Sequence, residues 1–152
     1  MQKFLRTLTL MALLAVPWVT QAQQTLPYSY GFEDNNLSTD GWLLQNASSS
    51  SGIDGSAAQD GSYGFKFYYG EQNDATLISP VLTGTTNGVA VSFYYKEYSA
   101  SYGDEQFYVG YTTDETATDP DDFTYGSIIT ASPTVTESSS CATFSRMLLA
   151  NT

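Results

Sequence analysis

The sequence predicts an all-β protein built as an antiparallel two-sheet β-sandwich. Three observations carry this prediction. No stretch after residue 22 keeps a helical periodicity, short runs rich in aromatic and β-branched residues recur, and Gly, Asn, Asp and Ser separate those runs. Strands of this length and spacing are typical of two packed antiparallel sheets. These patterns alone do not separate an immunoglobulin-like sandwich from a jelly roll.

The individual strands are predicted from alternation, because successive side chains of a strand point to opposite faces. In residues 106–112, for example, Phe107 and Val109 alternate with Gln106 and Tyr108. A loop over residues 99–105 is predicted to join two antiparallel strands as a hairpin. The predicted strands are residues 28–32, 41–45, 64–69, 75–79, 89–98, 106–112 and 126–130. The predicted core is Phe32, Trp42, Phe65, Phe67, Leu77, Val91, Phe93, Phe107 and Val109.

Residues 118–123 are predicted to form a single helical turn. Asp119 can cap the turn, and Pro120 suits its first position. Capping and the helix dipole account for the acidic residues at this place, so they predict a structural element in preference to a metal site.

The first 22 residues are predicted to be a secretory signal peptide. Lys3 and Arg6 precede an apolar run over residues 8–19, and small residues follow at 20–22. The apolar run is short for a membrane span. We therefore expect a secreted or cell-surface protein whose single domain is residues 23–152, with no transmembrane segment after removal of the signal.

Charge and composition exclude several functions. The formal net charge of −11 repels phosphate backbones, so nucleic acid is not an expected partner. The chain has no His, and Cys141 is the lone Cys, so neither a Ser-His nor a Cys-His pair can form. Asp104 and Glu105 are adjacent acids, but neighbouring strand residues point to opposite faces and cannot flank one bond. We therefore expect no enzymatic activity.

Five motifs follow one another in the chain. They are Leu26-Pro27-Tyr28 with Gly31-Phe32-Glu33, then Gly41-Trp42, then Asn73-Asp74-Ala75-Thr76-Leu77-Ile78-Ser79-Pro80, then Val91-Ser92-Phe93-Tyr94-Tyr95, and then Glu105-Gln106-Phe107-Tyr108-Val109-Gly110-Tyr111. In this order they resemble one family, the choice-of-anchor J and cleaved-adhesin domains of secreted and surface proteins from Bacteroidetes-type bacteria. The resemblance covers residues 26–113 and implies a jelly roll, MAM-like or galactose-binding-like.

The end of the chain departs from the family pattern. Leu149-Ala150-Asn151-Thr152 stands where the family has a Leu-Pro-Ala-Gly-Thr segment that leads into the last strands. Arg146 and Met147 do not fit that pattern. The resemblance therefore implies a C-terminally incomplete domain that lacks its last strands.

The resemblance also implies a structural calcium ion near the start of the domain. The matching positions are Glu33, Asp34 and Asp74. Calcium prefers six to eight oxygen ligands, which carboxylates and carbonyls supply. The alternative is that these are ordinary loop acids of an acidic protein.

Tyrosines are the candidate ligand-binding residues. Tyr68, Tyr94 and Tyr108 fall on the predicted outer faces of their strands. An amphipathic ring can stack on a sugar or anchor a protein contact. The alternative is that Tyr is simply a good strand former on half-exposed surfaces.

These observations predict a noncatalytic secreted or cell-surface adhesion module that binds an extracellular carbohydrate or protein. Two alternatives stay open: an accessory domain of a secreted protease or glycosidase, and a calcium-stabilised structural spacer.

Overall fold

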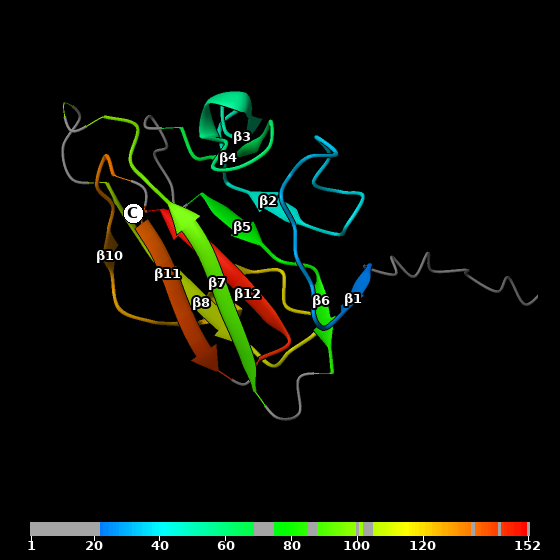
Figure 1. Cartoon of the computed structure of the whole chain (residues 1–152). Coiled ribbons are helices and arrows are strands. Elements are labelled where there is room, and N and C mark those ends of the chain that lie inside the picture. The colour runs from blue at the N-terminus through cyan, green and yellow to red at the C-terminus, as the bar shows by residue number, and fades with distance from the viewer. Residues whose placement is uncertain are drawn as a thin grey trace, which may run out of the picture.

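A computed structural model describes residues 22–68, 75–84, 88–99, 101, 105–134, 136–142 and 144–151. These residues form an all-β fold in which short strands alternate with loops (Figure 1). The strands are β1 (Gln23–Thr25), β2 (Leu43–Gln45), β3 (Gly52–Asp54), β4 (Gly64–Lys66), β5 (Thr76–Ile78), β6 (Val81–Thr83), β7 (Val89–Tyr95), β8 (Gln106–Thr112), β9 (Thr124–Tyr125), β10 (Ile129–Thr130), β11 (Thr136–Ala142) and β12 (Arg146–Asn151). Two short 3-10 helices, η1 (Gly55–Ala57) and η3 (Pro120–Asp122), lie between strands.

The largest sheet is antiparallel. Its order is β10-β8-β12-β5-β2, and β9 pairs with β8. β7 and β11 form a separate antiparallel pair of seven residues each, from Thr136 opposite Tyr95 to Ala142 opposite Val89. A third antiparallel pair joins β3 to β4, and a parallel pair joins β1 to β6.

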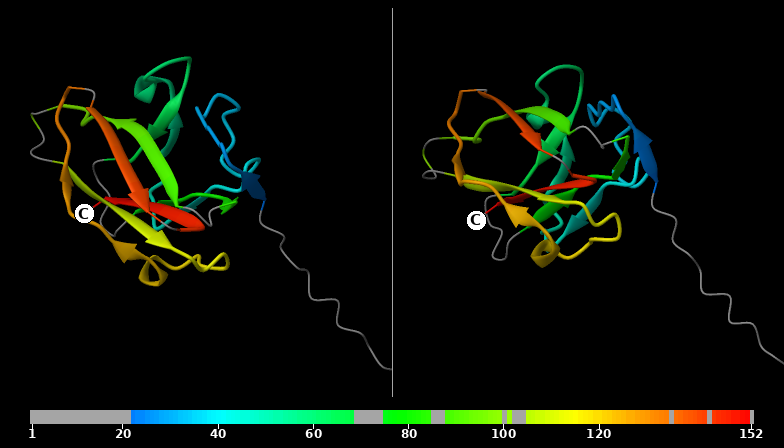
Figure 2. Two further views of the ribbon diagram at one scale, coloured as in Figure 1. Left: turned by 60° about the horizontal axis from the view of Figure 1, so that its bottom comes forward. Right: turned by 90° about the horizontal axis from the view of Figure 1, so that it is seen from below.

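The β7–β11 pair and the large sheet are the two layers of the sandwich. Both views of Figure 2 show β7 and β11 on one side of the core and β8 and β12 on the other. The inward side chains of β7 meet those of β8 there: the rings of Phe93 and Phe107 lie 6.2 Å apart, and those of Tyr95 and Phe107 lie 5.0 Å apart. The predicted sandwich is therefore confirmed.

The predicted core is also confirmed. All nine predicted residues lie in one cluster, either buried or packed against its buried members. Along β7 the exposure alternates, with Phe93 half-buried and Ser92 and Tyr94 exposed. The assumed register of this strand is thus correct, because a slip of one residue would have reversed the two faces.

The predicted hairpin over residues 99–105 is wrong. β7 pairs with β11, whereas β8 pairs with β9, β10 and β12, so the chain crosses from one layer to the other between β7 and β8. The physical reason is the aromatic packing: Phe93 and Phe107 face each other across the core, whereas neighbours in one sheet would point to the same side.

Residues 28–32 do not form the predicted strand. Phe32 has a positive φ of 65° and accepts a hydrogen bond at its carbonyl from the Asn35 N–H, which closes a turn. Their rings are nevertheless part of the core: Tyr30 stacks on Trp42 at 5.7 Å, and the Trp42 indole N–H donates to the Tyr28 hydroxyl. The segment is thus held by its side chains and not by a strand ladder.

The last described segment, Arg146–Asn151, is itself a strand at the centre of the large sheet, between β8 and β5. The expectation that this segment only leads into a strand is therefore wrong, and Arg146 and Met147 are the first residues of the strand. Met147 faces the main core, and Leu148 faces a second cluster on the opposite side of the sheet. A strand buried on both faces needs a continuous apolar run, which this segment supplies.

The second cluster lies on the outward face of the large sheet and was not predicted. The segment that contains Ala117, η3 and Phe123 covers this face, and the cluster comprises Ile78, Ala117, Phe123, Leu148 and Ala150 with Leu43 packed against it. The predicted helical turn is confirmed here: Asp119 caps η3 by accepting from the Asp121 N–H at 3.0 Å.

Arg146 is a fully buried cation beside this second cluster. Its Nε and Nη2 donate to the Ser79 carbonyl at 3.2 and 2.9 Å, and its Nη1 donates to the Ala117 carbonyl at 2.5 Å. Burial lowers the pKa of the Arg146 guanidinium, and the charge of Asp114 opposes this effect. One side chain therefore ties the loop before η3 to the corner between β5 and β6.

Candidate functional site: the outer face of β7 and β11

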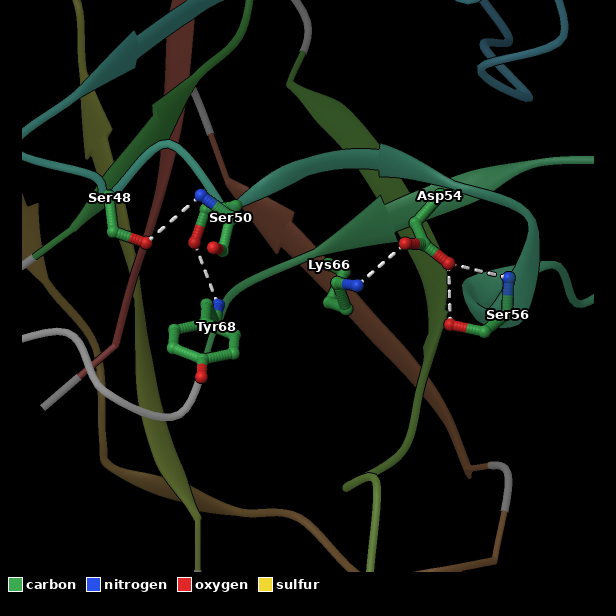
Figure 3. A network of polar contacts seen from close by, with 7 residues as sticks. Ser48, Ser50, Asp54, Ser56, Lys66 and Tyr68 are labelled. Carbon is green, nitrogen blue, oxygen red and sulfur yellow. Dashed lines mark hydrogen bonds and ion pairs between the residues drawn. The ribbon is translucent and has the colours of Figure 1, made fainter.

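The three candidate tyrosines lie in three different places. Tyr68 follows β4 and is half-buried, and its N–H donates to Ser51 Oγ at 2.7 Å (Figure 3). Tyr108 lies on the large sheet and is half-buried, with its ring edge-on to that of Tyr125 at 5.7 Å. Tyr94 lies on β7 and is 56% exposed. The structure therefore does not bring the three together, and Tyr94 alone among these three is exposed.

Tyr94 lies on the exposed outer face of the β7–β11 pair. Its direct neighbour across the pair is Glu137, and the next outward pair is Ser92 with Ser139. The exposed side chains here are Ala90, Ser92 and Tyr94 of β7, Lys96 directly after β7, and Glu137 and Ser139 of β11. In Figure 1 the β7 and β11 ribbons lie in front of the large sheet, and their outer face is turned to the viewer.

Tyr94 differs from the packed aromatic residues in having no role in the core. Tyr28 and Tyr30 contact other rings and donate or accept hydrogen bonds, and burial raises the pKa of Tyr28 to about 12, against the effect of the Trp42 hydrogen bond. The Tyr94 side chain makes no ring contact and no hydrogen bond to any residue that the structure describes. Its ring is therefore free to contact a ligand.

The β3–β4 hairpin that carries Lys66 and Tyr68 has a structural explanation (Figure 3). Lys66 Nζ pairs with Asp54 Oδ2 at 2.6 Å, and Asp54 Oδ1 accepts from the Ser56 N–H and hydroxyl. The hydrogen bond from Lys66, followed by those from Ser56, holds the pKa of Asp54 well below its ordinary value. Asp54 is thereby the N-cap of η1, which begins at Gly55.

Two of the three predicted calcium ligands are engaged in hydrogen bonds within the protein. Both carboxylate oxygens of Glu33 accept from the Ser62 N–H at 3.0 Å, and Oε1 also accepts from the Tyr63 N–H at 3.1 Å. Asp34 Oδ1 accepts from the Tyr30 hydroxyl at 2.7 Å and from the Asn36 N–H. These contacts fix loops and need no ion.

The third predicted ligand, Asp74, lies outside the described residues. Within the part of the chain that is described, no group of three or more acidic or Cys side chains gathers in a way that could hold a metal ion. The calcium site stays a prediction, with Glu33 as its most informative position.

Glu33 clamps the loop at Gly61 to the start of the domain. Gly61 has a φ of +73°, and a Cβ added there would lie 2.5 Å from Glu33 Oε1, so the loop passes directly over the carboxylate. We expect Glu33→Gln to lower the melting temperature of the full chain by about 4 °C, because the two backbone N–H groups lose a charged acceptor.

The measurement is thermal unfolding of the wild type and Glu33→Gln, each in calcium and in chelator. A purely structural clamp gives the same loss under both conditions. A calcium site adds a stabilisation that the wild type shows in calcium and the variant lacks. An unchanged melting temperature of the variant in chelator would contradict the clamp.

No helix among the described residues has the length and apolar character needed to cross a membrane. Comparison of the chain with family models, with curated proteins and with solved structures gives no match. The site must therefore be interpreted from its own geometry.

Proposed function

We propose that this protein is a noncatalytic secreted or cell-surface adhesion module of the choice-of-anchor J and cleaved-adhesin type, which binds a carbohydrate or a protein on the outer face of β7 and β11. The ordered motifs over residues 26–113 and the antiparallel two-layer fold support the family assignment. The apolar run near the N-terminus supports export.

The observation that carries the binding function is the exposed Tyr94 on a face whose described side chains are all exposed. Tyr94 is 56% exposed, so apolar surface of its ring is in contact with water. Binding of a ligand over the ring would remove this surface from water, which is favourable. Strand propensity alone accounts for a Tyr at this position, so the proposal must be tested by removing the ring.

The test compares the wild type with Tyr94→Ala and with Tyr125→Ala, a matched control. Tyr125 is also an exposed tyrosine, at 41%, but it lies on β9 in the other layer. Binding of the full chains is measured by interferometry on immobilised neutral glycans, acidic glycans, collagen and fibronectin. We expect at least one ligand whose affinity falls about thirtyfold in Tyr94→Ala, the effect of losing a central aromatic anchor, and is unchanged in Tyr125→Ala.

Loss of binding in both variants, or in neither, would place the ligand elsewhere. Absence of any binding would favour the structural spacer over the adhesion module.

A further inference from the structure

We infer that the outer face of β7 and β11 binds an uncharged, linear polysaccharide, with the Tyr94 ring stacked on a sugar ring. The inference rests on the proposed function, because it names the ligand class of the same face. It is argued from the shape of the face, its polar groups and its charge.

The face has an area of small side chains next to the Tyr94 ring. Ser92 and Ser139 are paired across the strands next to Tyr94 and Glu137, and Ala90 continues the row along β7. Neighbouring strands lie about 4.8 Å apart, and residues two apart on one strand are separated by about 7 Å. Small side chains over such an area leave a flat surface of about the size of a sugar ring, with the taller Tyr94 ring at its border.

The polar groups suit hydroxyls. The Ser92 and Ser139 hydroxyls can donate or accept, the Glu137 carboxylate can only accept, and the Lys96 ammonium can only donate. A sugar presents hydroxyls that can satisfy all three kinds of group at its rim, while its C–H face packs on an aromatic ring.

The face around Tyr94 offers few apolar contacts to a protein partner. A protein anchor residue normally sits among other apolar groups that exclude water around it. Around Tyr94 the exposed neighbours on the face are instead hydroxyls and charges.

Charge excludes acidic glycans. Lys96 and Glu137 compensate each other on the face, but the whole chain carries a formal net charge of −11. A polymer of uronates or sulfates would meet this field at every residue, whereas an uncharged polysaccharide would not.

A second exposed ring lies near the face in sequence. Tyr98, three residues beyond the end of β7, is 80% exposed. Two Cα atoms four residues apart can be separated by up to about 13 Å. A ligand that contacts both rings would therefore be a chain of sugars and not a single one.

The experiment is affinity electrophoresis of the full chain in gels that contain one soluble polymer each. The neutral polymers are galactomannan, xyloglucan, mixed-linkage β-glucan and dextran, and the acidic ones are alginate and chondroitin sulfate. The wild type is run beside Tyr94→Ala, Tyr98→Ala, Glu137→Gln and the Tyr125→Ala control, with thermal unfolding confirming that each variant is folded.

We expect at least one neutral polymer to retard the wild type and Tyr125→Ala, with tenfold or greater weakening in Tyr94→Ala and a smaller weakening in Tyr98→Ala and Glu137→Gln. Binding that depends on Tyr94 but occurs only with an acidic polymer, or only with collagen or fibronectin, would overturn this inference and leave the proposed function standing. Binding to a neutral polymer that survives Tyr94→Ala would overturn both.

Discussion

Replacing Arg146 by Met should lower the free energy of unfolding by about 2–4 kcal/mol, because two buried carbonyls lose hydrogen bonds from a charged donor. Arg146 is fully buried, and its guanidinium donates to the carbonyls of Ser79 and Ala117. Met fills a similar volume but donates nothing, so both carbonyls would stay buried without this donor.

The measurement is urea unfolding of the full chain, followed by Trp fluorescence and circular dichroism. Arg146→Lys is the control that keeps the charge and loses the forked geometry, and we expect it to fall between the wild type and Arg146→Met. Lys66→Met, which removes a partly exposed cation from its pair with Asp54, should have a much smaller effect. Equal stability of Arg146→Met and the wild type would show that the guanidinium does not hold the loop before η3.

The second large effect is expected for Phe144→Ala, with a loss of about 3–5 kcal/mol. Phe144 is 1% exposed, belongs to the main core, and lies 4.8 Å from the ring of Tyr111. Its position just before β12 means that the cavity would open between the two layers. The same unfolding measurement on Tyr94→Ala provides the surface control, for which we expect a change within about 0.5 kcal/mol. A loss below about 1 kcal/mol for Phe144→Ala would contradict the described packing of the core.

Alternation allowed most of the sandwich to be predicted. β8 was predicted with its observed ends, and the inward side chains of β7 were identified correctly, because one face of each strand is buried and the other is open. Local chemistry also allowed η3 to be predicted, since its cap, Asp119, and Pro120 are adjacent in the sequence.

The pairing of the strands could not be predicted in this way. A short loop after an amphipathic strand suggests a hairpin, but only long-range packing decides that β7 and β8 face each other across the core. β11 is rich in Ser and carries no strong alternation, and it is a strand because it pairs with β7 along its whole length. In β12, the charge of Arg146 hides a strand that is buried on both faces.

The candidate site was predicted only in part. Strand period placed Tyr94 and Tyr108 on outer faces, but it could not show that the segment ending in Tyr125 covers Tyr108 while the face around Tyr94 stays open. Glu137 and Ser139 were not predicted to belong to the face, because their position depends on the β7–β11 register. The hydroxyl-rich composition of residues 136–142 is the one signal in the sequence that could have pointed to them.

The central claim is that the ligand binds the outer face of β7 and β11. The most direct test is a titration of the full chain followed by backbone amide NMR. The titrant is an oligosaccharide fragment of the polymer that retards the protein in affinity electrophoresis. We predict that the shifted amides cluster on residues 90–98 and 136–139, with the largest changes around Tyr94 and Glu137. Shifts confined to the other outer face, at Tyr108, Tyr125 and their neighbours, would contradict the account.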